Sequence, residues 1–336
     1  MATELALAAA IFAALCLYFV LAGADFGGGV WDLLARGPRA ERQRAAVAHA
    51  IGPVWEANHV WLILVVVLLF SGFPPAFAAL SVALHVPLTL FLLGVVLRGA
   101  AFAFRGFDAT GDRAQLRWGR LFSVASTISP LLLGMVVGAL ASGRIRVARD
   151  GLVSGGFFAP WLTPFSLALG VFALALCAFL AATYLTVELE RADPELAEDF
   201  RRRALGAGVL VGVAAFAALA LAGQGAPRVR EGLAARAWRW PFHAATGLAA
   251  LLALASLVRR RYRRARAAAV AQTLLVLGGW AASQYPFLVV PDVTLASAAA
   301  NPQTRVLLLV ALAVGAPVLV PSLAVLFRVF KAARRA

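Results

Sequence analysis

Charged residues are scarce in this 336-residue chain, and cysteine is nearly absent. Asp, Glu, Lys and Arg together make up 14% of the residues, whereas 62% are hydrophobic. That balance excludes an ordinary soluble enzyme and is typical of a polytopic membrane protein. The two cysteines, Cys16 and Cys177, lie in apolar runs and lack a CxxC spacing, so no cysteine-based metal site is expected.

The hydrophobic residues are gathered in long runs. A helix needs about 20 residues to cross about 30 Å of hydrocarbon. Runs of that length predict an all-α integral membrane protein, with residues 1–336 forming a single polytopic domain of nine spans. The predicted spans cover approximately residues 5–24, 50–71, 76–98, 120–141, 163–187, 204–223, 241–258, 266–286 and 305–329.

The basic residues predict the orientation of these spans. There are 31 Lys and Arg against 16 Asp and Glu, and most of the basic residues lie in alternate loops, such as RRRYRRAR at 259–266. By the positive-inside rule these loops face the cytoplasm, so the N-terminus lies outside and the C-terminus inside. The net charge of +15 is thus explained by topology and contact with anionic lipid, and no nucleic-acid partner is expected.

Two acids are placed near the cytoplasmic ends of the first two predicted spans. Asp25 follows the first span, and Glu56 lies in the segment GPVWEANHVWL (52–62) that opens the second. Ionisable groups at membrane depth are costly, so they are candidates for function. Glu56 and His59 share a helix face, and with Asp25 they predict a proton path whose carboxyl groups are partly desolvated. The predicted supporting residues are Asn58, Trp55, Trp61 and Arg98.

A purely structural interpretation of the same residues stays open. Asp25 would then cap a helix, and Glu56 would interact with a helix N-terminus. Arg98 either pairs with one of the acids or extends to the interface. Asp32 is expected to be an ordinary interfacial charge. The run 27–29, three glycines, lacks the features of a phosphate loop and is expected to permit close backbone approach.

The four histidines raise the question of a haem. Only His85 and His243 are expected at a similar depth, toward the outer half of the membrane, so a haem held by this chain alone is not expected. A proton-coupled secondary transporter is an alternative function, since transporters also carry acids within the membrane. Transporter sites lie near the midplane, whereas these acids gather near one face, which favours a one-sided proton entrance.

Six segments, in this order along the chain, resemble subunit II of cytochrome bd-type quinol oxidases. The first hundred residues carry the most specific part of this resemblance, and WEANHVW favours the branch that includes cyanide-insensitive oxidases. The segments are LAGADFGGGVWDLLA (21–35), GPVWEANHVWL (52–62), FPPAFAAL (73–80), LRGAAFAFR (97–105), AATYLTVELE (181–190) and SQYPFLVVPDVTL (283–295).

The resemblance implies nine helices, arranged as two four-helix bundles plus a peripheral helix, in the bacterial inner membrane. It implies a heterodimer with a homologous haem-bearing subunit I, a small single-span accessory subunit, and a complex that oxidises quinol and reduces oxygen to water. Haem b and haem d would lie in subunit I. This chain would bind no haem, would have no catalytic residue of its own, and would stabilise its partner.

Asp25 and Glu56 match the family's acidic positions for cytoplasmic proton uptake. Ala22 and His59 stand where many members have further acids, so the remaining two are expected to be more sensitive.

Overall fold

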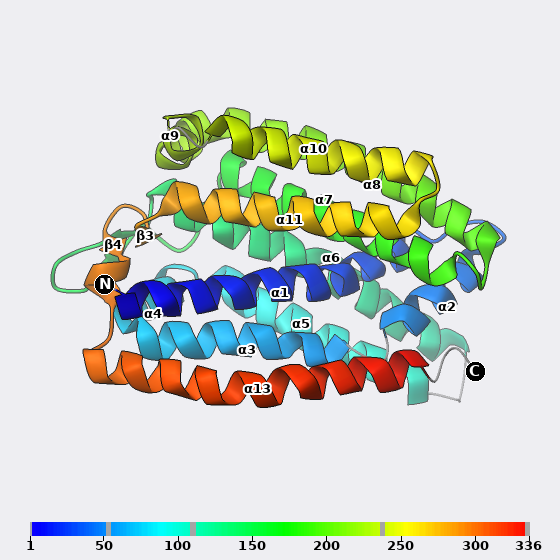
Figure 1. Ribbon diagram of the computed structural model, residues 1–336, viewed down its shortest axis with the longest axis horizontal. Coiled ribbons are helices and arrows are strands. Elements are labelled where there is room, and N and C mark those ends of the chain that lie inside the picture. Colours follow the sequence, from blue (N-terminus) through cyan, green and yellow to red (C-terminus); the bar gives the residue numbers. More distant parts are fainter. Residues whose placement is uncertain (1, 52–54, 108–111, 236–238, 333–336) are drawn as a thin grey trace.

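The computed structural model describes residues 2–51, 55–107, 112–235 and 239–332, which are mostly helical (Figure 1). The long helices run along a common axis. The N-terminus, β3, β4 and α9 lie at one end of this axis, the hairpin end, and α2 lies at the other, the α2 end. The elements are α1 (Ala2–Leu33), α2 (Ala40–Ile51), α3 (Trp55–Gly72), α4 (Pro74–Ala83), α5 (His85–Phe107), α6 (Asp112–Ser142), β1 (Arg146–Val147), β2 (Val153–Ser154), α7 (Pro164–Leu189), α8 (Pro194–Gly225), α9 (Pro227–Ala235), α10 (Arg239–Val258), α11 (Tyr262–Gln284), β3 (Phe287–Val289), β4 (Val293–Thr294), α12 (Leu295–Ala298) and α13 (Pro302–Ala332).

Within the described ranges, eight helices are long and apolar enough to cross a membrane, and the pair α3–α4 makes a ninth if it counts as one broken span. The prediction of an all-helical membrane protein is therefore confirmed. The predicted span 76–98 was wrong at its start, because α4 is bent by 116° from α3 and the crossing helix begins only at His85. Pro74 and Pro75 cause this break, since proline starts a helix readily and cannot continue one. The predicted start of the second span was also early, because residues 50 and 51 end α2.

Helix α7 forms the centre of the bundle and contacts α8, α6, α1 and α11. It starts where the Thr163 hydroxyl accepts a hydrogen bond from the Ser166 amide at 3.0 Å, ahead of a first-turn proline. Helix α8 starts in the same way at Asp193, which accepts from the Leu196 amide at 3.1 Å. The polar segment 188–203 is thus mostly an extension of these two helices, since α7 ends at Leu189 and α8 begins at Pro194.

Helix α1 runs unbroken through the glycine run to Leu33, beyond the predicted end near residue 24. The expected close approach is confirmed. A Cβ on Gly27 would lie 2.0 Å from the Cys177 carbonyl oxygen of α7, and one on Gly29 would lie 2.2 Å from the Cβ of Ser126 on α6. Glycine costs about 1 kcal/mol relative to alanine in a helix interior, so tight contact with two neighbouring helices explains its presence.

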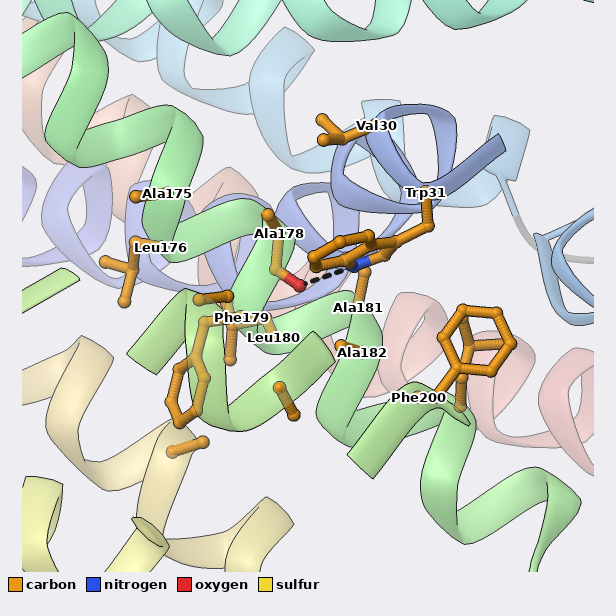
Figure 2. Packing of buried hydrophobic residues seen from close by; sticks show 14 of the residues in the cluster. Val30, Trp31, Ala175, Leu176, Ala178, Phe179, Leu180, Ala181, Ala182 and Phe200 are labelled. Carbon is orange, nitrogen blue, oxygen red and sulfur yellow. Dashed lines mark hydrogen bonds between the residues drawn. The ribbon is translucent and has the colours of Figure 1, made fainter. Parts of the chain in front are cut away.

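The last turn of α1 is fixed by a buried tryptophan (Figure 2). The indole nitrogen of Trp31 donates a hydrogen bond of 2.8 Å to the carbonyl oxygen of Ala178. Val30, Phe179 and Phe200 belong to the same apolar cluster, which joins α1, α7 and α8. The orientation of α1 about its own axis is therefore fixed where its acidic residues lie.

Ion pairs close both ends of the bundle. At the hairpin end, Arg146 of β1 contacts Asp292, between β3 and β4, at 2.7 Å, and its guanidinium lowers the pKa of that carboxyl. At the α2 end, Arg39 binds Asp199 through two nitrogens, at 2.8 and 2.7 Å. Arg42 contacts Asp193 at 2.6 Å and lowers its pKa.

Candidate functional site

Helix α1 carries a line of buried polar side chains. Tyr18, Asp25 and Asp32 are 1%, 6% and 3% exposed, and each is seven residues from the next. Seven residues are nearly two helical turns, so the three lie on one face of α1, about 10 Å apart along its axis. This face runs from the α2 end toward the middle of the bundle.

Asp25, the middle member, receives a hydrogen bond from Asn58 of α3. The amide nitrogen of Asn58 donates to the carboxylate of Asp25, and both side chains are buried. Glu56 is two residues earlier on the same helix and is exposed. Residues at i and i+2 point to different sides of a helix, so α3 cannot direct Asn58 and Glu56 to the same carboxylate. The structure therefore brings Asn58 to Asp25 and leaves Glu56 outside this cluster.

Arg98 of α5 supplies a buried positive charge. Its guanidinium lies 4.9 Å from the ring centre of Phe26 and 5.6 Å from that of Phe122. It is 1% exposed and interacts electrostatically with Asp25 and Tyr18. A planar guanidinium suits this position because it can stack on aromatic rings while its charge offsets a buried carboxylate.

His59 lies on the rim of this cluster. It is half-buried, its ring centre lies 6.0 Å from that of Tyr18, and it interacts electrostatically with Arg98. Trp61 is partly buried and packs against the apolar core. Trp55 is the first residue of α3, and its side chain lies outside the described part of the chain.

The three remaining histidines lie apart from this cluster, and all are exposed. The ring of His85 meets Phe157 edge-on, with centres 5.3 Å apart. A ring nitrogen of His243 lies 3.1 Å from the carbonyl oxygen of Leu233 on α9. Across the described residues, no three or more His, Cys, Asp and Glu side chains converge as a metal site would require.

Asp32 is not the interfacial charge that the sequence suggested. Its carboxylate accepts a hydrogen bond of 2.5 Å from the hydroxyl of Ser123, and both side chains are buried. The sequence did not reveal this because the covering helix, α6, is distant in the chain. The seven-residue spacing from Tyr18 through Asp25 to Asp32 was the signal that could have revealed the whole line.

The cluster can hold a proton at a buried carboxylate between an amide and a guanidinium. Two of its polar atoms, Asn58 Oδ1 and the Tyr18 hydroxyl oxygen, have no hydrogen-bond partner among the described residues. Buried polar atoms of this kind are usually satisfied by water, which also carries protons.

A protein-family model matches nearly the whole chain. The model, described as cytochrome bd terminal oxidase subunit II, covers residues 3–330. The chain belongs to the cytochrome bd terminal oxidase subunit II family. The resemblance seen in the six sequence segments is therefore confirmed.

Individual relatives agree with this assignment. The chain is 28% identical over 206 residues to the cytochrome bd ubiquinol oxidase subunit 2 of Bacillus subtilis (strain 168), covering 60% of this chain and 58% of that protein. It is 30% identical over 172 residues to the cytochrome bd-I ubiquinol oxidase subunit 2 of Escherichia coli (strain K12), covering 50% and 44% respectively. The matched region thus spans about half the length of these relatives. The fold is similar to the bd oxidase from Geobacillus thermodenitrificans, with a TM-score of 0.81, 21% identity and coverage of 98% of this chain and 99% of that chain.

Membership of the subunit II family and the number of spans establish the location of the chain. It is a multi-pass protein of the bacterial inner membrane. Its buried carboxylates therefore lie in helices that cross a lipid bilayer, where an ionised group needs a partner or a function.

Proposed function

We propose that this chain is the non-haem-ligating subunit II of a quinol-oxidising, oxygen-reducing complex, and that its cluster around Asp25 conducts protons toward the haem-bearing subunit I. The observation that carries the proposal is the buried contact of Asp25 with Asn58, beside the guanidinium of Arg98. An acid that exchanges protons needs groups that stabilise both of its charge states. The guanidinium favours the carboxylate, and the amide oxygen of Asn58 can accept a hydrogen bond from the neutral acid. The family assignment favours this function over a proton-coupled transporter.

The position of Glu56 supports a partner on the outer face of α3. Glu56, Ile63 and Phe70 are all exposed and are spaced by seven residues, so they lie along one face of that helix. A carboxylate at the head of an apolar stripe is costly against lipid but acceptable against a protein that binds it. We assign this face to subunit I, which this chain would stabilise, and Glu56 to the point where protons pass between the subunits. His59, on the rim of the Asp25 cluster, would lie between the two acids.

The haems are assigned to the partner, because His85 and His243, the pair expected at a similar depth, do not fit one. A haem ligand must point into an enclosed pocket, whereas His85 faces Phe157 at the surface and His243 faces a backbone carbonyl. Haem b and haem d, together with the site of quinol oxidation, would therefore lie in subunit I. The small accessory subunit implied by the resemblance would complete the complex.

The topology belongs to the same proposal. Residues 1–336 would form a single membrane domain, with two four-helix bundles and α13 as the peripheral helix. The hairpin end would face outward and the basic α2 end would face the cytoplasm, in agreement with the positive-inside rule. Protons would then enter from the α2 end.

The complex should be purified after co-expression with the haem-bearing subunit. We expect reduced-minus-oxidised spectra with the bands of haem b and haem d, and oxygen consumption when a short-chain quinol is added. A colourless chain that purifies without a second large subunit would refute the assignment.

Substitutions then test the proton path at unchanged haem content. Asp25→Asn should lower quinol-driven oxygen consumption about tenfold or more, because a positioned proton-transfer group typically contributes a factor of 10² or more. Glu56→Gln should also slow it, and Asp25→Glu should retain part of the rate. Glu41→Gln, at an exposed acid of α2, is the matched control and should have no effect. Normal turnover of Asp25→Asn with intact haems would remove the proposed role.

A further inference from the structure

A second buried acid lies between the Asp25 cluster and the α2 end of the bundle. Asp32 is the penultimate residue of α1 and is 3% exposed, with the hydroxyl of Ser123 at 2.5 Å. A carboxylate in the last turn of a helix is disfavoured by the helix dipole. Asp32 therefore does not stabilise the C-terminal end of α1, and its presence there calls for another explanation.

A second observation lies one turn further along α6. Ser126 is fully buried, and its hydroxyl has no hydrogen-bond partner among the residues that the structure describes. Ser126 packs closely against Gly29 of α1: a Cβ added to Gly29 would lie 2.6 Å from the Ser126 hydroxyl oxygen. Gly29 is three residues from Asp32 and four from Asp25. The unpaired hydroxyl therefore lies at the level midway between the two acids.

The direct distance between the acids explains why an intermediate is needed. Seven residues of helix separate Asp25 and Asp32 by about 10 Å along the axis, whereas a hydrogen bond spans about 3 Å. A hydroxyl can accept one proton and donate another, so it can relay charge without a net change. Ser123 already links Asp32 to α6, and Ser126 continues the line toward Asp25.

We propose that Asp32 loads protons from the α2 end and that Ser126 relays them to Asp25. The carboxylate of Asp32 takes a proton from cytoplasmic water. A water next to Ser126 receives that proton and passes one to the serine oxygen, while the serine gives its own proton on toward the carboxylate of Asp25. Each group returns to its starting state when the proton moves on toward subunit I, and no electron is transferred in this chain. The inference rests on the function proposed above and extends it to a named point of uptake.

The test uses the purified complex with its haems, and quinol-driven oxygen consumption per haem is measured from pH 6 to pH 9. Asp32→Asn should lower turnover about tenfold, because the amide can still accept from Ser123 but cannot carry a proton. The loss should grow with pH, since proton supply limits the rate there. Asp32→Glu should restore most of the rate, and Ser126→Ala should slow it several-fold. Ser129→Ala is the matched control, because the Ser129 hydroxyl is equally buried but donates to the Ala125 carbonyl of its own helix at 2.8 Å.

Three results would overturn the proposal. Normal turnover of both Asp32→Asn and Ser126→Ala would show that protons enter elsewhere. Equal loss of haem in Asp32→Asn and Asp32→Glu would show that the acid serves only to hold α1 and α6 together. A rate reduced equally at all pH values would point to the same structural role.

If Asp25→Asn slows the enzyme while both Asp32→Asn and Ser126→Ala do not, the proposed function stands and only the uptake point is wrong. If Asp25→Asn is also normal, the proposed function fails with it.

Discussion

Gly27 provides the sharpest test of how α1 is held in the bundle. In Gly27→Ala the new Cβ would lie 2.0 Å from the Cys177 carbonyl oxygen, 2.4 Å from its carbonyl carbon and 2.8 Å from the Cβ of Ala181. Ordinary contacts of this kind do not fall below 3.0 Å, so α1 and α7 would have to separate by about 1 Å. The atoms that obstruct it are backbone atoms, which cannot move aside as a flexible side chain would.

The magnitude follows from two opposing effects. Alanine improves the helix propensity by about 1 kcal/mol. Overpacking a tight interface costs about 1–3 kcal/mol, and more where backbones collide. The net expectation is a destabilisation of about 1–2 kcal/mol, with larger values if the Trp31–Ala178 hydrogen bond of 2.8 Å is lost as well.

Gly23 is the matched control on the same helix. Its added Cβ would meet the Cys177 sulfur at 3.4 Å, which is an ordinary contact. Gly23→Ala should therefore leave the complex as stable as the wild type, or slightly more stable. The assay is thermal unfolding of the detergent-solubilised complex, followed by tryptophan fluorescence and haem absorbance. Equal midpoints for Gly27→Ala and Gly23→Ala would refute the close approach of α1 and α7.

Three further predictions concern single contacts. Arg98→Met should destabilise the complex by about 3–5 kcal/mol in thermal unfolding, because it leaves a buried acid without its cation, and Arg98→Lys should lose less. Thr163→Ala should cost about 1 kcal/mol in the same assay through loss of the α7 cap, whereas Thr163→Ser should be neutral. The Arg146–Asp292 contact should be pH-dependent. Its carboxyl has a lowered pKa in the folded state, so the contact stabilises above the ordinary pKa of an aspartate and is lost as the pH falls through the folded value. Limited proteolysis of the hairpin end should then accelerate in acid, and Arg146→Ala should remove that acid-induced change.

The spans could be predicted from sequence because bilayer thickness fixes how many apolar residues a crossing helix needs. The break between α3 and α4 could be predicted only in part. Two prolines marked the turn after Phe73, but the following segment to Ala83 is as apolar as a span, so composition could not show that it turns by 116°. The direction of α4 relative to α3 depends on the residues that α4 packs against, and hydropathy does not identify those residues.

The site could be predicted less well than the fold. The segment around Asn58 could be identified from sequence, because its polar residues lie within a predicted span. Which of these residues contacts Asp25 depends on the rotation of α3 about its axis. That rotation is set by packing against α1, so Asn58 reaches the acid and Glu56 does not. Asp32 was misjudged for a related reason, since the residue that covers it, Ser123, lies 91 residues away in the chain.

The Trp31–Ala178 hydrogen bond has a consequence for how the protein is made. Its two residues are 147 positions apart, so α1 leaves the ribosome long before α7 exists. In the first part of that interval, before Asn58 and Ser123 are made, Asp25 and Asp32 lie in a helix without the side chains that contact them in the finished chain. The first helix must therefore wait at the membrane with two costly groups until the later helices arrive.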